Sequence, residues 1–308
     1  MRDISRKVKS LRIATARSIV RVSPNTTELI KQGQIPKGDP LQVARVAAVQ
    51  SAKGTSQIIP YCHPIPVEFV GVDFELTYNT IVTTTTVKAV YKTGVEMEAL
   101  TAAAVAALTL YDMLKMLDND MEITGVTLLS KKGGKSDFKQ HCDEPLQAAV
   151  IVLSDSVAAG QKTDSSGKLI VERLSSEGVT VVDYLVIADD LETIEKTLLL
   201  CCDEMKLDLV VTTGGTGLSK RDCAPEAMAR VLERQIPGIT ETARAYGQER
   251  TPYAMLSRSV AGVRGKTLIV SLPGSPGGVS DSLDALLPPL LHSFHIISGG
   301  GHHEHKKL

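Results

Sequence analysis

The first 130 residues combine helical and extended hydrophobic patterns. Runs rich in β-branched residues flank a Tyr78-Asn79 turn, and apolar side chains at helical spacing precede and follow them. The predicted order is helix, strand, strand, helix, strand, over residues 41–56, 67–76, 81–91, 94–117 and 122–130. Locally paired strands with helices on one face predict an α+β fold, a ferredoxin-like antiparallel sandwich.

The second half of the chain has a different pattern, in which short continuous apolar runs alternate with helical stretches. The runs cover residues 149–153, 180–187, 208–213 and 267–272. Parallel strands that are buried on both faces have such continuous apolar runs. We therefore expect an α/β doubly wound domain with a mostly parallel sheet.

A polar segment, KKGGKSDFKQHCDEPLQ at residues 131–147, separates the two patterns. It is rich in glycine and lysine, and an apolar strand, AAVIVLS, follows it. A chain of 308 residues is long enough for two domains. We expect these domains at residues 1–140 and 147–308.

Composition and charge exclude several classes of protein. With 34 basic and 35 acidic residues, the chain lacks the positive field of a nonspecific nucleic-acid binder. Its five cysteines include no CxxC pair, so neither a disulfide framework nor a tetrathiolate zinc site is indicated. The apolar stretch 99–117 contains Asp112 and Lys115, and residues 1–10 are polar. We expect a soluble, cytoplasmic protein with no membrane partner.

Polar side chains recur in five stretches of the front half: KGD, PYCHP, TGVEMEAL, YDMLK and LLSKKGGKS. Seven of their titratable side chains are candidates for a site: Lys37, His63, Glu96, Glu98, Asp112, Lys115 and Lys131.

Purely structural roles are also open for these residues. Glu96 could form a capping box with Thr93, and His63 could be an ordinary loop histidine. Asp112 and Lys115 could be a surface ion pair, although an idle charge pair is disfavoured in so apolar a helix.

The spacing of two of these carboxylates restricts the site. Glu98 and Asp112 are fourteen residues apart, or roughly 21 Å along a straight helix. They cannot meet at one small reacting centre within one chain. Either the ligand is long or the site joins two chains.

The motifs KGDPLQVAR, IIPYCHPI, KTGVEMEALTAAAVAALTLYDMLK and KKGGKS, in this order, closely resemble the cyclic pyranopterin monophosphate synthase (MoaC) family over residues 3–139. The resemblance implies that 3′,8-cyclo-7,8-dihydro-GTP is rearranged to cyclic pyranopterin monophosphate, with release of pyrophosphate. It also implies a hexamer with sites between subunits. No cofactor is assigned to the front half.

The resemblance assigns the seven candidates to the catalytic site. Asp112 and Lys115 are the best general acid/base pair among them, because each is close enough to shift the other's pKa. It places five residues against the substrate: Tyr61, Cys62, His63, Met97 and Glu98. Two positions depart from the family pattern. Gly54 stands where the family usually has Arg, and Ser136 is followed by Asp137 where GGKSG is usual.

In the back half, three polar loops follow predicted parallel strands: LSDS at 153–156, TTGGTGLSKRD at 212–222 and LPGSPGG at 272–278. Glycines at strand ends allow backbone N–H groups to approach a phosphate. The candidate ligand-binding residues are Ser154, Asp155, Thr213, Gly214, Gly215, Thr216, Gly217, Ser275, Pro276, Gly277 and Gly278.

Three carboxylates, Asp155, Asp189 and Asp222, accompany these loops. Two of them could instead cap helices: Asp189 would form a capping box with Glu192, and Asp222 would precede a helix starting at Pro225. A carboxylate beside phosphates commonly holds Mg²⁺.

The loops, together with the DxSG motif at 164–167 and the PEA motif, resemble the MogA/MoaB molybdopterin adenylyltransferase family over residues 147–302. The resemblance implies transfer of AMP from MgATP to molybdopterin, usually in a trimer. It makes Asp189 and Asp222 the essential carboxylates and the candidate Mg²⁺ ligands. One departure is Ala224, where the family commonly has Thr.

Together, the two resemblances identify a bifunctional molybdenum cofactor biosynthesis protein. We expect it to act on small molecules as a homo-oligomer, a trimer or a hexamer. In a rival hypothesis the back half is a non-catalytic pterin-binding or scaffolding module. The tail GGGHHEHKK has three histidines, and we expect a solvated terminus there rather than a metal site.

Overall fold

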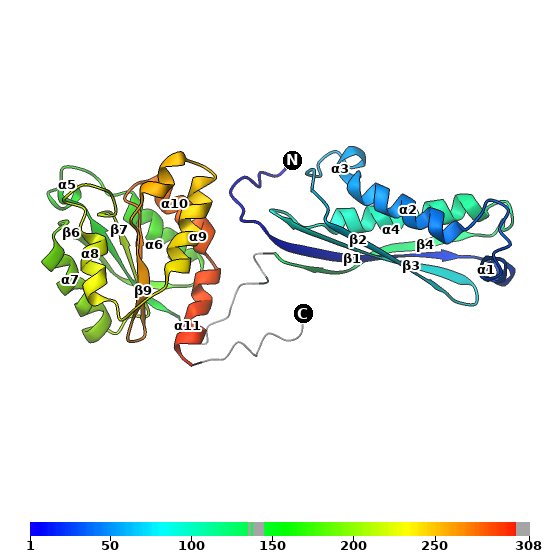
Figure 1. Cartoon of the computed structure of the whole chain (residues 1–308). Helices are drawn as coiled ribbons and strands as arrows, with labels where there is room; N and C mark the ends of the chain where they lie inside the picture. The colour runs from blue at the N-terminus through cyan, green and yellow to red at the C-terminus, as the bar shows by residue number, and fades with distance from the viewer. Residues whose placement is uncertain (135–136, 138–144, 300–308) are drawn as a thin grey trace. The chain divides into compact units, whose positions relative to one another are not determined.

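The computed structural model describes residues 1–134, 137 and 145–299. It divides the chain into two compact units, Met1–Asp137 and Phe138–Leu308 (Figure 1). Much of the predicted linker, including residues 138–144, and the histidine-containing tail lie outside the described residues. Each unit is described by itself below.

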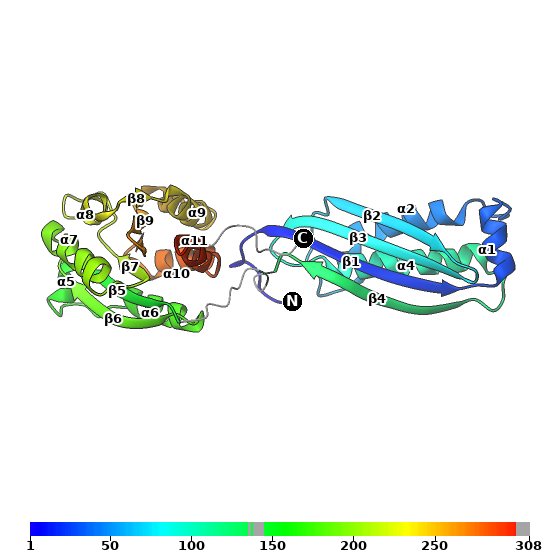
Figure 2. The same cartoon turned by 90° about the horizontal axis from the view of Figure 1, so that it is seen from below.

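The first unit contains one four-stranded sheet. Its elements, in chain order, are β1 (Ser10–Arg21), α1 (Pro24–Lys31), α2 (Pro40–Lys53), α3 (Thr55–Ile58), β2 (Phe69–Leu76), β3 (Thr80–Tyr91), α4 (Glu96–Leu114) and β4 (Glu122–Lys132). The strand order is β2-β3-β1-β4, and all neighbours are antiparallel. Helices α2 and α4 cover one face of the sheet (Figures 1 and 2). The predicted antiparallel α+β sandwich is confirmed.

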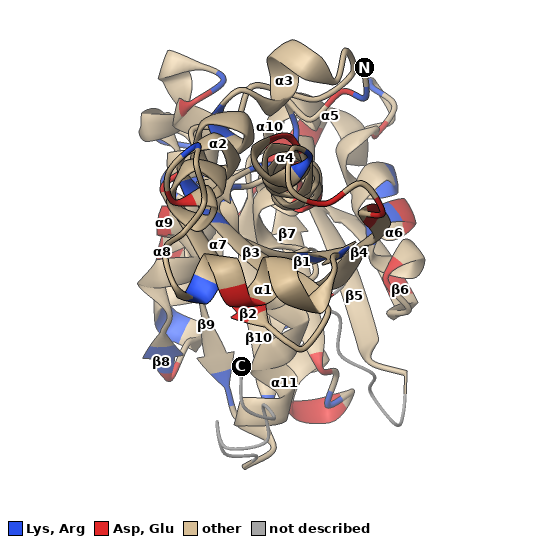
Figure 3. Ribbon diagram, turned by 90° about the vertical axis from the view of Figure 1, so that its right-hand side faces the viewer, with Lys and Arg blue, Asp and Glu red and all other residues tan. Residues whose placement is uncertain are grey.

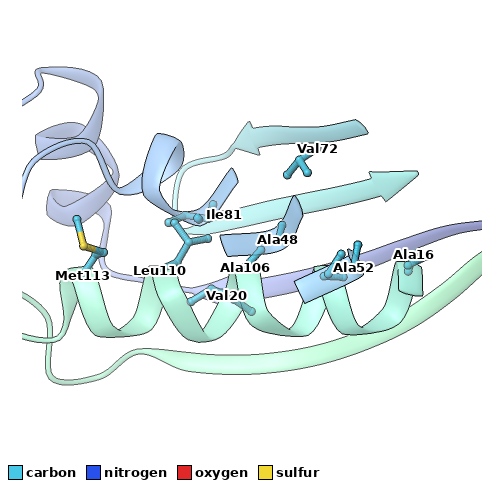
Figure 4. Packing of buried hydrophobic residues seen from close by; sticks show 14 of the residues in the cluster. Ala16, Val20, Ala48, Ala52, Val72, Ile81, Ala106, Leu110 and Met113 are labelled. Atoms are coloured by element: carbon cyan, nitrogen blue, oxygen red, sulfur yellow. The ribbon is translucent and has the colours of Figure 1, made fainter. Parts of the chain in front are cut away.

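Small side chains form the core between α4 and the sheet (Figure 4). Ala99, Ala103 and Ala106 of α4 are fully buried, as are Ala14 and Ala16 of β1. Because these side chains end at Cβ, the helix can pack close to the strands. By length and composition α4 could cross a membrane, but over half of its most apolar window is buried inside the unit. Its interpretation as a core helix is confirmed.

Strand β1 was missing from the predicted order. Its buried positions include Arg12, Ala14, Ala16 and Ser18, whereas the more apolar Leu11 lies on the exposed side. Small and polar side chains therefore occupy most of the buried face of this strand, so its sequence lacks the large apolar residues that usually mark such a face. Only the close approach of α4 explains why small residues occupy the buried face.

The second unit alternates strands and helices around one six-stranded sheet. Its strands are β5 (Gln147–Leu153), β6 (Thr180–Ile187), β7 (Leu209–Thr213), β8 (Arg234–Gln235), β9 (Ala261–Arg264) and β10 (Thr267–Leu272). The larger helices are α6 (Ser166–Ser176), α7 (Leu191–Leu199), α8 (Ala224–Val231), α9 (Pro237–Gln248) and α10 (Pro276–Leu286). Shorter helical segments are α5 (Asp155–Ala158), η2 (Leu200–Glu204), η3 (Pro252–Leu256), η4 (Pro289–Leu291) and α11 (His292–Ile297).

The strand order in this sheet is β6-β5-β7-β10-β9-β8. The first four strands are parallel, and β9 and β8 continue the sheet in antiparallel pairing. Separate hydrophobic clusters lie on the two faces, one containing Val150 and Leu283, the other Ile151 and Met228. The predicted doubly wound, mostly parallel domain is confirmed. The short strands β9 and β8, of which β8 forms the edge of the sheet, were not predicted.

This topology positions the polar loops of the second unit. Strands β5, β7 and β10 are adjacent and parallel, so their carboxyl ends meet at one edge of the sheet. The loops that begin at Ser154, Gly214 and Pro273 therefore leave the sheet side by side.

Candidate functional sites

Two groups of charged residues lie at opposite ends of α4 in the first unit. At the carboxyl end, Lys115 Nζ is 2.8 Å from Asp112 Oδ1, and Lys37 Nζ is 3.1 Å from Asp112 Oδ2. Lys37 also donates a hydrogen bond to the Asp112 carbonyl oxygen at 2.7 Å. Figure 3, in which α4 is seen almost end-on, shows acidic and basic positions at this end.

The Asp112–Lys115 pair is exposed, so the apolar character of the helix does not argue against an ion pair on its surface. The two side chains are 59% and 56% exposed. Although α4 is apolar overall, Asp112 lies in its last turn and Lys115 is the residue at its C-cap. The Lys115 and Lys37 ammonium groups lower the pKa of Asp112, and Asp112 raises the pKa of Lys115. Both partners are therefore charged at neutral pH in the isolated chain.

The second group lies at the amino end of α4, where Glu96 Oε1 is 3.3 Å from Lys131 Nζ of β4. The capping box of Thr93 and Glu96 does not form. The helix begins at Glu96 itself, and the cap position is Val95, which makes no side-chain cap. In a capping box the glutamate is the third residue of the helix, whereas Glu96 is the first, so Glu96 cannot bond back to the cap residue.

Glu98 is buried, and its Oε2 atom has no hydrogen-bond partner among the described residues. Burial raises the pKa of Glu98 to about 7, and the nearby charge of Glu96 adds to the effect. Burial also raises the pKa of the Cys62 thiol, and the charge of Glu98 raises it further.

The raised pKa of Glu98 predicts how stability depends on pH. A carboxyl with a pKa of 4.5 in the unfolded chain and about 7 in the folded chain keeps its proton more firmly when folded. Stability is then highest below pH 4.5 and falls as the pH rises to about 7, by on the order of 3 kcal/mol in total. Hydrogen exchange of α4 measured by mass spectrometry should show Glu98→Gln to be more stable than the parent at pH 8 but not at pH 4.5.

The exposed Glu75→Gln on β2 is the control for this comparison. It removes a carboxylate from the same unit without removing a buried one. Equal pH profiles for the parent and Glu98→Gln would contradict the prediction.

The other predicted residues of this unit are not gathered into one site within a single chain. Tyr61 and Met97 are 77% and 39% exposed, and His63 is half-buried. Ser136 lies outside the described residues. At Gly54, an added Cβ would be 3.5 Å from its nearest neighbour, the Gln50 carbonyl oxygen, so the backbone there accepts a side chain.

In the second unit, the three predicted loops surround one cavity of about 340 Å³. It is lined by Ser154 and Ser156 after β5, by Thr213 and Gly214 after β7, and by Gly274 and Pro276 after β10, together with residues 162–166. Thr213 Oγ1 donates a hydrogen bond to the Pro273 carbonyl oxygen at 2.8 Å, which joins two of the loops. The remaining loop residues, among them Thr216 and Gly277, lie on the same loops but not on the wall of this cavity.

Close approach of the backbones requires glycine at two positions of the central loop. Gly214 has φ +101°, and a Cβ there would be 2.1 Å from the Leu153 carbonyl oxygen. Gly215 has φ +62°, and its Cβ would be 2.7 Å from Asp189 Oδ1. A side chain at either position would displace its neighbour.

Replacement of Gly214 by alanine should therefore lower the stability of the domain more than replacement of a glycine that has a positive φ but no close neighbour. Gly160 is the matched control, since it has φ +69° with no atom within 4 Å of an added Cβ. We expect Gly160→Ala to cost about 1–2 kcal/mol of stability, and Gly214→Ala about 1–3 kcal/mol more. Hydrogen exchange of β5 and β7 peptides measures both, and equal losses would contradict the steric argument.

The carboxylates near this cavity are not the caps that the sequence also allowed. Asp190, and not Asp189, caps α7 by accepting a hydrogen bond from the Thr193 N–H at 2.9 Å. Asp222 accepts from the Ser219 N–H at 2.7 Å, and the cap position of α8 is Cys223. Asp189 and Asp222 thus have no capping role.

Asp189 lies among other acidic groups. Its backbone N–H donates to Asp155 Oδ1 at 3.1 Å, and its Oδ1 accepts a hydrogen bond from Cys223 Sγ at 3.4 Å. Burial raises the pKa of Asp189, and the charges of Asp222 and Asp155 raise it further. A cation near this carboxylate would relieve the repulsion.

These residues could hold a Mg²⁺ ion that binds together with phosphates. They do not form a complete set of protein ligands for a metal ion by themselves. Among the described residues, no group of three or more His, Cys, Asp and Glu side chains could hold a metal ion. Mg²⁺ typically uses one or two carboxylates together with phosphate oxygens and water. Asp189 and Asp222 can supply such a pair.

The structure also adds a residue to this site that no sequence motif indicated. Arg258, from the loop before β9, donates to the Gly217 carbonyl oxygen at 2.7 Å and to the Asp222 carbonyl oxygen at 2.5 Å. Its third contact is an ion pair with Glu226. Arg258 thereby holds the middle and the end of the glycine-rich loop, although it lies 36 residues beyond Asp222 in the chain.

Family comparisons divide the chain in the same way as its two units. The MoaC family matches residues 1–134, and the family described as a probable molybdopterin binding domain matches residues 149–293. The molybdenum cofactor biosynthesis bifunctional protein of Chlorobaculum tepidum is 40% identical over 302 residues, covering 98% of this chain and 96% of the relative.

Other relatives match one half only. The cyclic pyranopterin monophosphate synthase of Clostridium perfringens strain 13 is 51% identical over 138 residues, 44% of this chain and 87% of that protein. The molybdopterin biosynthesis enzyme MoaB from Thermus thermophilus, known from its crystal structure, has 42% sequence identity and a TM-score of 0.48. The match covers 50% of this chain and 97% of MoaB.

Proposed function

Because this chain belongs to the family of molybdenum cofactor biosynthesis bifunctional proteins, we propose that its two domains catalyse two separate reactions of that pathway. It consists of a MoaC domain followed by a MogA/MoaB-like molybdopterin-binding domain. We assign the first reaction to residues 1–140 and the second to residues 147–308.

The first domain converts 3′,8-cyclo-7,8-dihydro-GTP to cyclic pyranopterin monophosphate and releases pyrophosphate. The observation that supports this most is the placement of two complementary charged groups at the two ends of α4. Lys37, Asp112 and Lys115 form one group, and Glu96, Glu98 and Lys131 belong to the other. Since the two ends are roughly 21 Å apart, a homo-oligomer, a trimer or a hexamer, would combine the groups from different chains.

Each group has chemistry that the reaction needs. The adjacent Asp112 and Lys115 can exchange a proton with the substrate as general base and acid. Glu98, with a pKa of about 7, can hold a proton at neutral pH and donate it in a hydrogen bond. Lysines such as Lys131 can stabilise the negative charge that develops as pyrophosphate leaves.

Incubation of the full chain with the cyclised dihydro-GTP tests this proposal directly. We expect equal amounts of pyrophosphate and cyclic pterin to form. A folded oligomer that forms neither product would rule out the synthase function for this chain.

The second domain transfers AMP from MgATP to molybdopterin. This proposal is supported by the cavity where three loops meet, with glycine backbones on its wall and with Asp189 and Asp222 at the same edge of the sheet. The phosphate of molybdopterin attacks the α-phosphorus of ATP, a new P–O–P bond forms, and pyrophosphate leaves.

Mg²⁺ bound by Asp189 and Asp222 would neutralise charge on the phosphates. The protein itself positions them through backbone N–H groups of the loop that starts at Gly214 and through the amino end of α10, which Ser275 caps by accepting a hydrogen bond from the Gly278 N–H at 3.2 Å. Arg258 keeps the central loop in place.

Titration with MgATP and molybdopterin separates this function from the rival scaffolding function. An adenylyltransferase forms AMP-pterin and pyrophosphate. A scaffold binds the pterin without consuming ATP, and that result would exclude the transferase.

A further inference from the structure

Arg258 connects the loop before β9 to the glycine-rich loop through its whole side chain. Its Nε and one terminal nitrogen donate to the Gly217 and Asp222 carbonyl oxygens, and the other terminal nitrogen pairs with Glu226. Its backbone N–H also donates, to the Thr216 carbonyl oxygen at 2.9 Å. Each guanidinium nitrogen therefore has a protein partner. We expect such a side chain to fix protein groups rather than to bind a substrate phosphate.

These contacts set the direction of two peptide groups in the glycine-rich loop. A trans peptide is planar, with its C=O and its N–H on opposite sides. Because the Thr216 and Gly217 carbonyl groups face Arg258, the N–H groups of Gly217 and Leu218 face away from it. Neither N–H donates a hydrogen bond within the part of the chain that the structure describes. Two consecutive free N–H groups in such a loop are suited to bind phosphate oxygens.

A third peptide group links Arg258 to Asp189. Arg258 donates to the Asp222 carbonyl oxygen, and the N–H on the other side of the same peptide, that of Cys223, donates to Asp189 Oδ1 at 3.5 Å. Gly217 also lies against the Asp222 carboxylate, since an added Cβ there would be 2.9 Å from Asp222 Oδ2. Arg258 is therefore linked both to the free N–H groups and to the two carboxylates proposed to hold Mg²⁺.

The segment that carries Arg258 is held in place by α9 and β10. Arg244 of α9 donates to the Ser259 carbonyl oxygen at 3.2 Å. The Val260 N–H donates to Ser271 Oγ of β10 at 2.7 Å, and Ser271 is buried. Because its backbone is fixed to a helix and to a core strand, Arg258 has its position before any ligand binds.

We propose that Arg258 is a positioning residue for the phosphates of ATP. It orients the Gly217 and Leu218 N–H groups so that they can donate to phosphate oxygens, and it keeps the Asp222–Cys223 peptide on Asp189. Arg258 does not itself touch the substrate, because its guanidinium nitrogens are bound to the protein. This inference rests on the transferase function proposed above, and it assigns the preparation of the nucleotide-binding loop to one side chain.

Hydrogen exchange of the peptide 212–223, measured by mass spectrometry in the full chain over a range of MgATP concentrations, tests the proposal. MgATP should slow the exchange of this peptide in the parent. We expect Arg258→Gln to raise the MgATP concentration that gives half of this protection by roughly ten-fold or more, since the N–H groups are no longer held in place. Arg258→Lys should raise it only several-fold, because an ammonium group keeps the charge but cannot reach all three partners.

Arg264 on β9 is the matched control. Its side chain is 26% exposed, compared with 34% for Arg258, and it also bridges separate elements, through Asp203 and the Val231 carbonyl oxygen. Arg264→Gln therefore removes a similarly bound arginine from the same domain and leaves the glycine-rich loop unchanged. We expect it to be half protected at the parent's MgATP concentration. In AMP transfer the KM for MgATP should rise roughly ten-fold in Arg258→Gln and stay at the parent level in Arg264→Gln.

Parent-like protection by MgATP in both Arg258→Gln and Arg258→Lys overturns the inference, even if AMP-pterin forms normally. A loop that MgATP does not protect in the parent overturns it as well, and so does an equal shift in Arg264→Gln, which would indicate a general loss of stability. Conversely, protection that depends on Arg258 supports the inference even if the parent forms no AMP-pterin, and then the transferase function alone fails. If Arg258→Gln does not fold, the comparison of Arg258→Lys with Arg264→Gln decides between these outcomes.

Discussion

Replacement of Asp112 or Lys115 by alanine should reduce formation of the cyclic pterin by roughly 10²- to 10⁴-fold, the usual contribution of a general acid or base. The two side chains form a close pair with Nζ–Oδ1 2.8 Å, and both are more than half exposed. Since neither contributes to the hydrophobic core, little change in stability is expected. The measurement is the rate of pyrophosphate and cyclic pterin formation from the cyclised dihydro-GTP.

A matched control is available in the same unit. Arg21 and Glu122 form another exposed ion pair, with side chains 55% and 53% accessible, and neither belongs to the candidate site. Arg21→Ala should leave product formation at the parent level. An equal loss in this control, or near-normal activity in Asp112→Ala and Lys115→Ala, would contradict the assignment of the pair.

A site formed between two chains predicts that variants at the two ends of α4 can complement each other. If the group around Asp112 in one chain works with the group around Glu98 in another, each single variant still contains one intact half. Coexpression of Asp112→Ala with Glu98→Gln should then restore part of the activity in mixed oligomers. No recovery from a confirmed mixed oligomer would argue that the two halves do not combine between chains.

In the second domain, Asp189→Asn should lower AMP-pterin formation by roughly 100-fold or more, because it removes a carboxylate proposed to hold Mg²⁺. The same change should preserve or increase the thermal stability of this domain at neutral pH. Burial and neighbouring carboxylates raise the pKa of Asp189 in the folded chain, so its ionised form opposes folding as the pH rises above about 4. Asparagine has the same shape and no charge.

Asp190→Asn is the adjacent control. Asp190 is exposed and caps α7 through Thr193, a role that asparagine also fills well. This variant should keep its AMP-transfer activity. Full activity in Asp189→Asn would refute the Mg²⁺ role. Hydrogen exchange of β5 and β7 peptides checks that the second domain is folded in either variant.

Several features could be predicted because they depend on short-range patterns. The β-branched runs predicted β3 and β6 to within a residue of their bounds. The three loops after β5, β7 and β10 followed from polar residues at the strand ends, accompanied by glycine after β7 and β10. Parallel pairing then places these loops together, whatever the details of packing. The cavity that they share was therefore predictable in outline.

Capping residues were harder to predict because several acidic or hydroxyl residues stand close together. Asp189 and Asp190 are neighbours, and both precede the same helix. A shift of one residue in the helix start decides which of them accepts the hydrogen bond from the first turn. The sequence pattern is compatible with either start, so only the structure shows that Asp190 is the cap.

The sequence by itself determined the two domains' fold classes and the motifs that resemble two families, because periodicity and motif spacing are local properties of the chain. Only the tertiary structure decided which side chains meet. Arg12 occupies the buried face of β1 and faces Glu96 and Asp137, which lie 84 and 125 residues further along the chain. Arg258 reaches back to the loop at Gly217 in the same way. Such contacts depend on strand order and on how closely a helix approaches a sheet, and neither is encoded in any short stretch of sequence.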